Sequence, residues 1–206
     1  MRPVALSWLD IALGSPAENL RLDEELLAEG RGVLRIWETE RECVVLGQSG
    51  KPERDVHLDA CRNSGVPVLR RCSGGGAVLL GPGCLNYSLV LPLAWNPKWR
   101  DVRYSLEWAM TRMQRALAVP ALRSVGTCDL ALDQRKVSGN AQRRTHSSIL
   151  HHGTLLYSFD ATRPERFLGP PLSEPRYRAG RAHRDFLGNL PLTADEIKRR
   201  LASAWC

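Results

Sequence analysis

The sequence RRCSGGGAVLLGPGCLNYS occupies residues 70–88 and places three adjacent glycines, Gly74 to Gly76, between two apolar runs that read as strands. Glycine weakens a strand, because it packs no side chain and loses the most backbone entropy on folding. Three adjacent glycines therefore call for an explanation. Either the backbone bends at this point, or a ligand lies so close to it that any Cβ would collide with the ligand.

Apolar periodicity on both sides of the glycines predicts many short strands and a few helices. Short connections dominate, including a charged turn after residue 38 and a hairpin turn at Asp133-Gln134. They favour an α+β fold, with a mostly antiparallel sheet flanked by helices, over a doubly wound parallel sheet. The expected strands are residues 33–38, 42–47, 65–71, 77–80, 85–92, 128–132, 135–139 and 149–159, and the expected helices are residues 16–29, 56–63, 101–117 and 192–205. In the last of these, Thr193 and Glu196 have the spacing of a capping box.

Length and composition describe an ordinary globular chain. We expect a single domain over residues 1–206, because the sequence has neither an internal repeat nor a low-complexity linker. No apolar stretch approaches the length of a membrane span, and the first residues do not read as a signal peptide. The six cysteines include no CxxC pair and the histidines lack zinc-ligand spacing, so we expect reduced thiols in a cytoplasmic protein.

The formal net charge of +7 points to an anionic partner such as a nucleotide, an acidic protein, anionic lipid or nucleic acid. Neither an RNP1 motif nor a helix-turn-helix signal accompanies the charge, so nucleic acid is the less favoured partner.

The glycine segment itself lacks the two common phosphate-binding patterns. No GK[ST] follows it, as a Walker A loop requires, and it does not read GxGxxG. Its backbone N–H groups and the guanidinium groups of Arg70 and Arg71 suit a phosphate or a carboxylate. The alternative is a β-bulge with two surface arginines.

Two further segments carry chemical groups. In DQRKVSGNAQRR, Lys136 lies at the end of an expected strand, where a point charge can polarise a carbonyl or hold a phosphate oxygen, although a lone lysine is usually solvated. In ILHHGTLLYSFD, strand alternation sends His151 and His152 to opposite faces. One of them is expected to face a cavity, and the alternative is a histidine whose hydrogen bonds are satisfied in the core.

Three segments, taken together and in this order, resemble the catalytic domain of the lipoate–protein ligase family, which is related to biotin protein ligase. They are RRCSGGGAV with LNYS, KVSGNAQ and HHGTLL. The resemblance covers most of the chain. It implies an α+β domain of the class II synthetase and biotin-ligase type. It also implies that lipoate and ATP form lipoyl-AMP, with Mg²⁺ offsetting phosphate charge. The lipoyl group then passes to a lysine of a lipoyl-domain protein.

The resemblance also implies roles for individual residues. Lys136 would bind the acyl carbonyl oxygen and the adenylate phosphate, and Asp129 would lie near the metal. The triple glycine would line a narrow tunnel in which the acyl chain runs along bare backbone. The residues expected to bind substrate are Arg71, Ser73, Gly74, Gly75, Gly76, Ala77, Ser138, Gly139, Ala141, His152 and Gly153.

Three departures from the family pattern bear on the reaction. Leu80 and Gly81 stand where many ligases have His-Asp, and Cys128 precedes Asp129 where many have Asn. In addition, the sequence ends at Cys206 without the small accessory domain of many ligases, which implies a separate partner chain or a member that needs none.

These departures keep two other functions open. The first is an octanoyltransferase that takes an octanoyl group from acyl carrier protein as a thioester on Cys128, whose thiol pKa a nearby Lys136 would lower. The alternative for Cys128 is a buried, unreactive cysteine. The second is a binding-only or partner-dependent member. The expected acceptor is a lipoyl domain of a 2-oxoacid dehydrogenase subunit or a glycine-cleavage carrier protein, and the positive charge suits acidic carriers of either kind.

Overall fold

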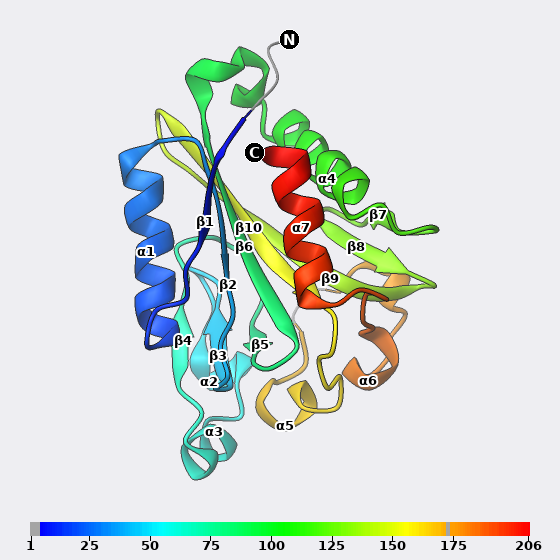
Figure 1. The fold of residues 1–206 in the computed structure, drawn as a ribbon. Coiled ribbons are helices and arrows are strands. Elements are labelled where there is room, and N and C mark those ends of the chain that lie inside the picture. Colours follow the sequence, from blue (N-terminus) through cyan, green and yellow to red (C-terminus); the bar gives the residue numbers. More distant parts are fainter. Residues whose placement is uncertain (1–4, 172–173) are drawn as a thin grey trace.

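The computed structural model describes residues 5–171 and 174–206 and contains two sheets with helices around them (Figure 1). The larger sheet has the strand order β1-β2-β6-β10-β9-β8-β7 and the smaller has the order β4-β3-β5. Only the pairs β1–β2 and β3–β4 are parallel among the strands described. The expected α+β class with a mostly antiparallel sheet is confirmed.

The elements have the following bounds. The strands are β1 (Ser7–Asp10), β2 (Val33–Trp37), β3 (Cys43–Leu46), β4 (Val68–Arg70), β5 (Val78–Leu80), β6 (Cys84–Pro92), β7 (Arg123–Val125), β8 (Asp129–Leu132), β9 (Arg135–Arg144) and β10 (Ser148–Leu156). The helices are α1 (Pro16–Glu29), α2 (Pro52–Asp55), α3 (Leu58–Ser64), α4 (Val102–Leu117), α5 (Pro164–Phe167), α6 (His183–Phe186) and α7 (Ala194–Trp205), with 3₁₀ turns at Leu93–Trp95, Pro97–Arg100 and Arg176–Arg178.

Helices cover both faces of the larger sheet (Figure 1). In β6, Leu89 and Leu91 pack in one cluster with residues of α4 and α7, whereas Val90 packs in another cluster with Leu26 and Leu27 of α1. Because neighbouring strand residues point to opposite faces, α1 lies on one face and the α4–α7 pair lies on the other. We call these the α1 face and the α4–α7 face.

Local capping signals in the sequence mark ends of the helices α1 and α7. Ser15 caps α1 by accepting a hydrogen bond from the Glu18 N–H, and Gly30 ends the helix in the left-handed region at φ 68°. Thr193 and Glu196 form both hydrogen bonds of the expected capping box at the start of α7.

Two short connections join strands of different sheets. The strands on either side of the charged turn, β2 and β3, belong to different sheets, and so do β5 and β6 on either side of the Gly-Pro-Gly turn. Both strands at the charged turn are fully buried, so each finds partners elsewhere in the chain rather than in its sequence neighbour. The short strands β1 and β7 and the helix α2 were not expected, and β9 continues five residues past its expected end at residue 139.

The hairpin at Asp133-Gln134 is confirmed, with Leu132 paired to Arg135. Both turn residues have positive φ, 48° and 63°, which is the backbone of the tight turns that suit the twist of a hairpin.

The first and last described elements meet. The Leu6 N–H donates to the Trp205 carbonyl over 2.8 Å, just before β1 begins beside β2. None of the helices in the described part of the chain is long and apolar enough to cross a membrane.

Candidate active site

The glycine segment forms an irregular loop over residues 71–77, between β4 and β5, and not a strand corner. The Arg71 side chain lies inside this loop. Its Nη2 donates to the carbonyls of Gly74 (2.7 Å) and Gly76 (3.0 Å), and its Nη1 donates to the Val45 carbonyl. Burial lowers the pKa of Arg71 to about 10, so the side chain stays positive at neutral pH. Arg71 therefore shapes the loop and gives it a positive charge.

The three glycines of the loop differ in what requires them. Gly75 has φ 96°, a conformation that L-residues rarely adopt. Gly74 and Gly76 are not in the left-handed region, and a Cβ built on either meets no protein atom within 4 Å. The protein's own packing and backbone therefore explain Gly75 but do not explain Gly74 and Gly76.

Ser73 ties this loop to the larger sheet. Its Oγ lies 2.6 Å from Nε2 of His152 on β10 and accepts a hydrogen bond from Arg71 Nε. The Ser73 hydroxyl is thus free to donate to the imidazole. Burial, with smaller contributions from Arg71 and His151, lowers the pKa of His152 to about 3, so the ring is neutral at physiological pH.

The facing residues of β9 continue this surface. His152 pairs with Ala141, and Gly139 lies two residues away on the same face. Ala77 lies at the far end of the loop and packs against the core of the smaller sheet. The loop residues, His152, Gly139 and Ala141 therefore share the α1 face.

An irregularity in the β8–β9 ladder turns Lys136 toward the same face. Leu130 pairs with Ser138 but Ala131 pairs with Lys136, so Val137 is an extra residue in β9. In a regular strand Lys136 would share the face of Ser138. The bulge instead puts Lys136 on the face of Gly139, where its Nζ lies 2.8 Å from Asp129 Oδ1.

Two cations act on the thiol of Cys128, because Lys136 and Arg71 both lower its pKa. Burial is the largest influence, however, and with Asp129 it leaves the pKa of Cys128 raised. The expected lowering by Lys136 is present, but burial and Asp129 outweigh it. The Cys128 Sγ donates to the Asn140 carbonyl over 2.7 Å.

Ser138 and Gly153 lie on the opposite, α4–α7 face. There the Asn140 side chain bonds to Ser138 Oγ and accepts a hydrogen bond from Tyr87. A Cβ on Gly153 would lie 1.9 Å from Asn140 Oδ1, so this glycine makes room for Asn140. The structure does not bring these two residues to the glycine loop.

His151 also lies on the α4–α7 face, where its Nε2 is 3.1 Å from Tyr87 Oη. Burial lowers the pKa of His151 to about 4. The two histidines therefore lie on opposite faces as expected, and the hydrogen bonds of His151 are satisfied in the core.

Tyr177 was missed by the sequence analysis. Its hydroxyl donates to Asp129 Oδ2 over 2.9 Å, although 48 residues separate the two in the chain. Nothing in the local pattern around residue 177 marks this contact, because it depends on how the segment after α5 folds back.

Among the candidate site residues, Asp129 is the one that offers a carboxylate to a divalent cation. The described residues contain no cluster of three or more His, Cys, Asp or Glu side chains that could hold a metal. Mg²⁺ commonly binds proteins through one or two carboxylates together with substrate phosphates. The residues present therefore fit a cation that arrives with a nucleotide and do not fit a resident metal centre.

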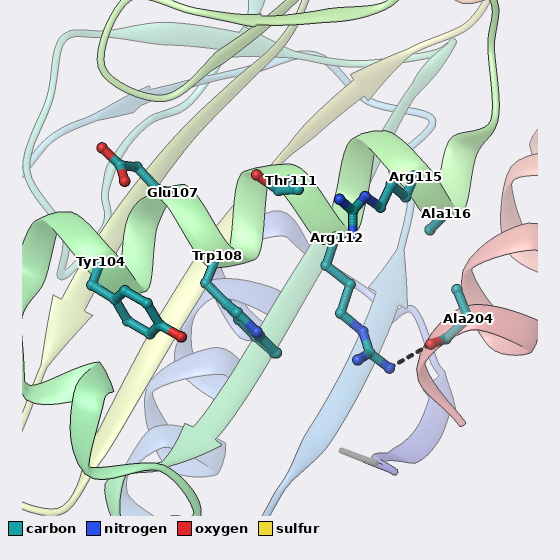
Figure 2. Close-up of a pocket in the computed structure, with 8 residues that line it drawn as sticks. All are labelled: Tyr104, Glu107, Trp108, Thr111, Arg112, Arg115, Ala116 and Ala204. Atoms are coloured by element: carbon teal, nitrogen blue, oxygen red, sulfur yellow. Dashed lines mark hydrogen bonds between the residues drawn. The ribbon is translucent and has the colours of Figure 1, made fainter. Parts of the chain in front are cut away.

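A separate cavity of about 590 Å³ lies beside α4 on the α4–α7 face (Figure 2). Tyr104, Trp108 and Arg112 extend from successive turns of α4, and Arg112 donates to the Ala204 carbonyl at the end of α7. None of the candidate residues lines this cavity, so it is distinct from the site on the α1 face.

The profile of the lipoyl protein ligase A/B catalytic domain matches residues 15–204. A protein assigned to lipoate-protein ligase A from Aeropyrum pernix is 33% identical over 164 residues, which cover 77% of this chain and 60% of that protein. The octanoyltransferase LipM of an Exiguobacterium species is 31% identical over 176 residues, covering 71% and 63%. The chain thus spans about three fifths of the length of the curated relatives it matches.

Solved structures share the fold. A bi-partite lipoate protein ligase from Thermoplasma acidophilum, studied with its E2 lipoyl domain, has a TM-score of 0.78 at 22% identity, covering 98% of this chain and 82% of that one. A structure of protein Ta0514 from the same organism with lipoic acid bound gives 0.76 at 20% identity, covering 98% and 83%. A lipoate-protein ligase A with bound ATP gives 0.79 at 20%, also covering 98% and 83%.

Proposed function

Because the chain belongs to the lipoyl protein ligase A/B catalytic domain family, we propose that it is an ATP-dependent lipoate–protein ligase. In the first step the lipoate carboxylate attacks the α-phosphorus of ATP, pyrophosphate leaves and lipoyl-AMP forms. In the second, the ε-amine of a lysine on a lipoyl domain attacks the acyl carbonyl, loses a proton and displaces AMP. The acyl group ends in an amide bond to the acceptor.

The position of Lys136 is the observation that carries this proposal. The bulge at Val137 aims its ammonium group at the face that holds the glycine loop, where Arg71 supplies a second positive charge. Both steps develop negative charge on phosphate or carbonyl oxygens, and a fixed cation in a partly buried site stabilises such charge. Lys136 would bind the carbonyl and phosphate oxygens, and Arg71 would hold the loop around the carboxyl end.

The glycine loop suits an acyl chain. Gly74 and Gly76 serve no packing need of the protein, so we assign them to the wall of an acyl tunnel that runs along bare backbone. Ser73, Gly75, Ala77 and the neutral His152 would complete this wall, and Gly139 and Ala141 would form the opposite one. A neutral imidazole can lie beside an apolar chain with little cost, whereas a charged one cannot.

Mg²⁺ would be held by Asp129 together with nucleotide phosphates, and it would offset phosphate charge. Asp129 binds Lys136 in the structure, so the same carboxylate would orient the lysine.

Cys128 is the observation that favours the second candidate, an octanoyltransferase, because the charges of Lys136 and Arg71 both act to lower the pKa of this half-buried thiol. Its raised pKa and its hydrogen bond to the Asn140 carbonyl support a structural thiol instead, since the thiolate is the nucleophilic form. We therefore rank the ligase first. A binding-only or partner-dependent member is the third possibility.

A lipoyl domain is the proposed acceptor, and acyl carrier protein is the proposed donor in the octanoyltransferase reaction. The net charge of +7 would speed encounter with an acidic carrier. Because the Thermoplasma ligase is bi-partite, we also propose a second chain as a possible requirement for activity.

Intact-mass spectrometry of an apo lipoyl domain tests the proposal. One reaction contains lipoate, ATP and Mg²⁺, and the other contains octanoyl-acyl carrier protein without ATP. We expect a lipoyl-sized mass gain that requires ATP. A gain only from the thioester, lost in Cys128→Ser, would instead establish the octanoyltransferase. If neither reaction labels the lipoyl domain, the assay is repeated with an accessory chain added. No mass gain there would indicate a binding-only member.

A further inference from the structure

The Asp129 carboxylate binds two side chains, one on each oxygen. Lys136 Nζ donates to Oδ1 over 2.8 Å and Tyr177 Oη donates to Oδ2 over 2.9 Å. Asp129 is only 8% exposed. A buried carboxylate with a partner on each oxygen has its orientation fixed by both, so removing either partner frees the other contact to move.

Tyr177 is itself held firmly by the segment that follows it. Its ring packs against the buried Phe186, with centroids 5.1 Å apart. Arg181 Nη2 donates to the Tyr177 carbonyl (2.7 Å) and to the Gln134 carbonyl in the β8–β9 turn (2.9 Å). Arg181 thus joins this segment to the hairpin that carries both Asp129 and Lys136.

The far end of the same segment contacts Lys136 directly. Leu187 forms a parallel bridge with Lys136, and the Gly188 N–H donates to the Lys136 carbonyl over 2.9 Å. Residues 175–188 therefore hold Lys136 at two points, through the backbone at residue 188 and through the Tyr177 hydroxyl by way of Asp129.

The Tyr177 hydroxyl donates to one oxygen of a nearly buried carboxylate, and a hydrogen bond to a carboxylate is stronger than one between neutral groups.

We propose that Tyr177 is a positioning residue, whose hydroxyl holds Asp129 in the orientation in which Asp129 holds Lys136 over the glycine loop. This inference rests on the proposed function, because it assigns Tyr177 to the reaction that Lys136 serves. It gives the basic segment after α5 a role in the site that the sequence alone left unassigned.

A second tyrosine provides a matched control. Tyr157 Oη donates to Glu38 Oε2 over 2.7 Å, and Lys198 Nζ lies 3.6 Å from Glu38 Oε1, so a tyrosine, a carboxylate and a lysine also meet outside the candidate site. Tyr177→Phe and Tyr157→Phe each remove one hydroxyl and keep the ring.

Competitive lysine labelling reads the position of Lys136 without any substrate. The chain has four lysines, Lys51, Lys98, Lys136 and Lys198, so peptide mass spectrometry after brief treatment with an N-hydroxysuccinimide ester resolves each one. In Tyr177→Phe we expect Lys136 to react about two- to tenfold faster, the factor that corresponds to one net hydrogen bond. Labelling of Lys51 and Lys98 should stay the same, and Tyr157→Phe should leave Lys136 unchanged.

Steady-state kinetics of lipoyl-AMP formation provide the second measurement. We expect Tyr177→Phe to lower kcat by about tenfold, because a displaced catalytic group costs rate before it costs binding. The KM for lipoate should change less than about twofold, and Tyr157→Phe should change neither constant.

The outcomes separate this inference from the proposed function. A wild-type protein that makes no lipoyl-AMP even with an accessory chain added contradicts the ligase, and Lys136 labelling then decides the positioning role alone. Equal Lys136 labelling in Tyr177→Phe and wild type would overturn the inference even if the ligase is active. So would a uniform rise at all four lysines together with a lower thermal midpoint, since that pattern indicates general loosening.

Discussion

Ser73 Oγ lies 2.6 Å from His152 Nε2, and this hydrogen bond fixes the glycine loop to β10, the central strand of the larger sheet. The bond needs a neutral imidazole, which burial provides. Loop geometry and the charge state of His152 are thus coupled, and several measurable consequences follow from this and from the neighbouring contacts.

Stability should fall on acidification. The pKa of His152 is lowered to about 3 and that of His151 to about 4, whereas an unfolded histidine titrates near 6.5. Because the unfolded state then binds protons first, the stabilisation is complete above about pH 6.5 and is lost progressively toward pH 3 to 4. Each histidine contributes a slope of up to about 1.4 kcal/mol per pH unit.

Urea unfolding at about pH 7, 6 and 5 measures this slope. His152→Gln should reduce the histidine part of this slope by about a third, because His151, His152 and His183 all have lowered pKa values. A free energy of unfolding that stays constant over this range would contradict neutral burial of the histidine pair.

Replacing Gly74 or Gly76 with alanine should preserve the stability of the protein but weaken its binding of lipoate. Neither Cβ meets a protein atom within 4 Å, so each variant should be as stable as wild type or up to about 1 kcal/mol more stable. Affinity for lipoate should nevertheless fall at least about tenfold, because the methyl group occupies the tunnel. Thermal unfolding and isothermal titration calorimetry give the two values.

Gly47→Ala is the control for that pair. Its Cβ would lie 2.0 Å from the Gly75 carbonyl oxygen, so this variant should lose stability by more than about 1 kcal/mol. Alanine variants of Gly74 and Gly76 that bind lipoate normally would rule out an acyl tunnel at this loop.

Replacing Lys136 with Met should affect catalysis far more than binding. The substitution removes the cation but keeps an unbranched chain of similar length. We expect the rate of lipoyl-AMP formation to fall by at least about 10²-fold, the usual cost of losing one group that stabilises developing charge. The dissociation constant for lipoate should change less than about threefold. A binding-only protein would show the reverse, with weaker binding and no turnover in wild type.

If the protein is a ligase, Cys128→Ser should change its activity little. The serine hydroxyl can still donate to the Asn140 carbonyl, which Cys128 Sγ contacts at 2.7 Å. ATP-dependent acylation should therefore stay within about threefold of wild type. Complete loss of acyl transfer with unchanged thermal stability would identify Cys128 as the nucleophile and favour the octanoyltransferase.

Local features of the fold were predictable from the sequence, and long-range pairings were not. The capping box of Thr193 and the hairpin at Asp133-Gln134 depend on residues only a few positions apart. By contrast, the apolar runs at residues 33–37 and 43–46 indicate that both segments are strands but do not indicate that they join different sheets. Partner choice depends on the whole set of competing strands.

Most residues of the candidate site could likewise be predicted from the sequence, but the backbone bulge that orients Lys136 could not. Resemblance in three motifs pointed to Arg71, Ser73, Lys136 and His152, and the structure gathers them on one face. The bulge at Val137 could not be anticipated, because a single extra residue leaves no mark in the apolar pattern yet reverses the direction of its neighbour. Strict alternation would have sent Lys136 to the core.

The hydrogen bond from Leu6 to Trp205 has a consequence for biosynthesis. While the chain is still being translated, β1 lacks this anchor until residue 205 has left the ribosome, and the central pairs β2–β6 and β6–β10 also join segments far apart in sequence. Such a high contact order predicts slow folding that is complete only after residue 205 has been made. A nascent or prematurely terminated chain would expose the bare edge of β2, a template for aggregation that the finished domain covers with its first strand.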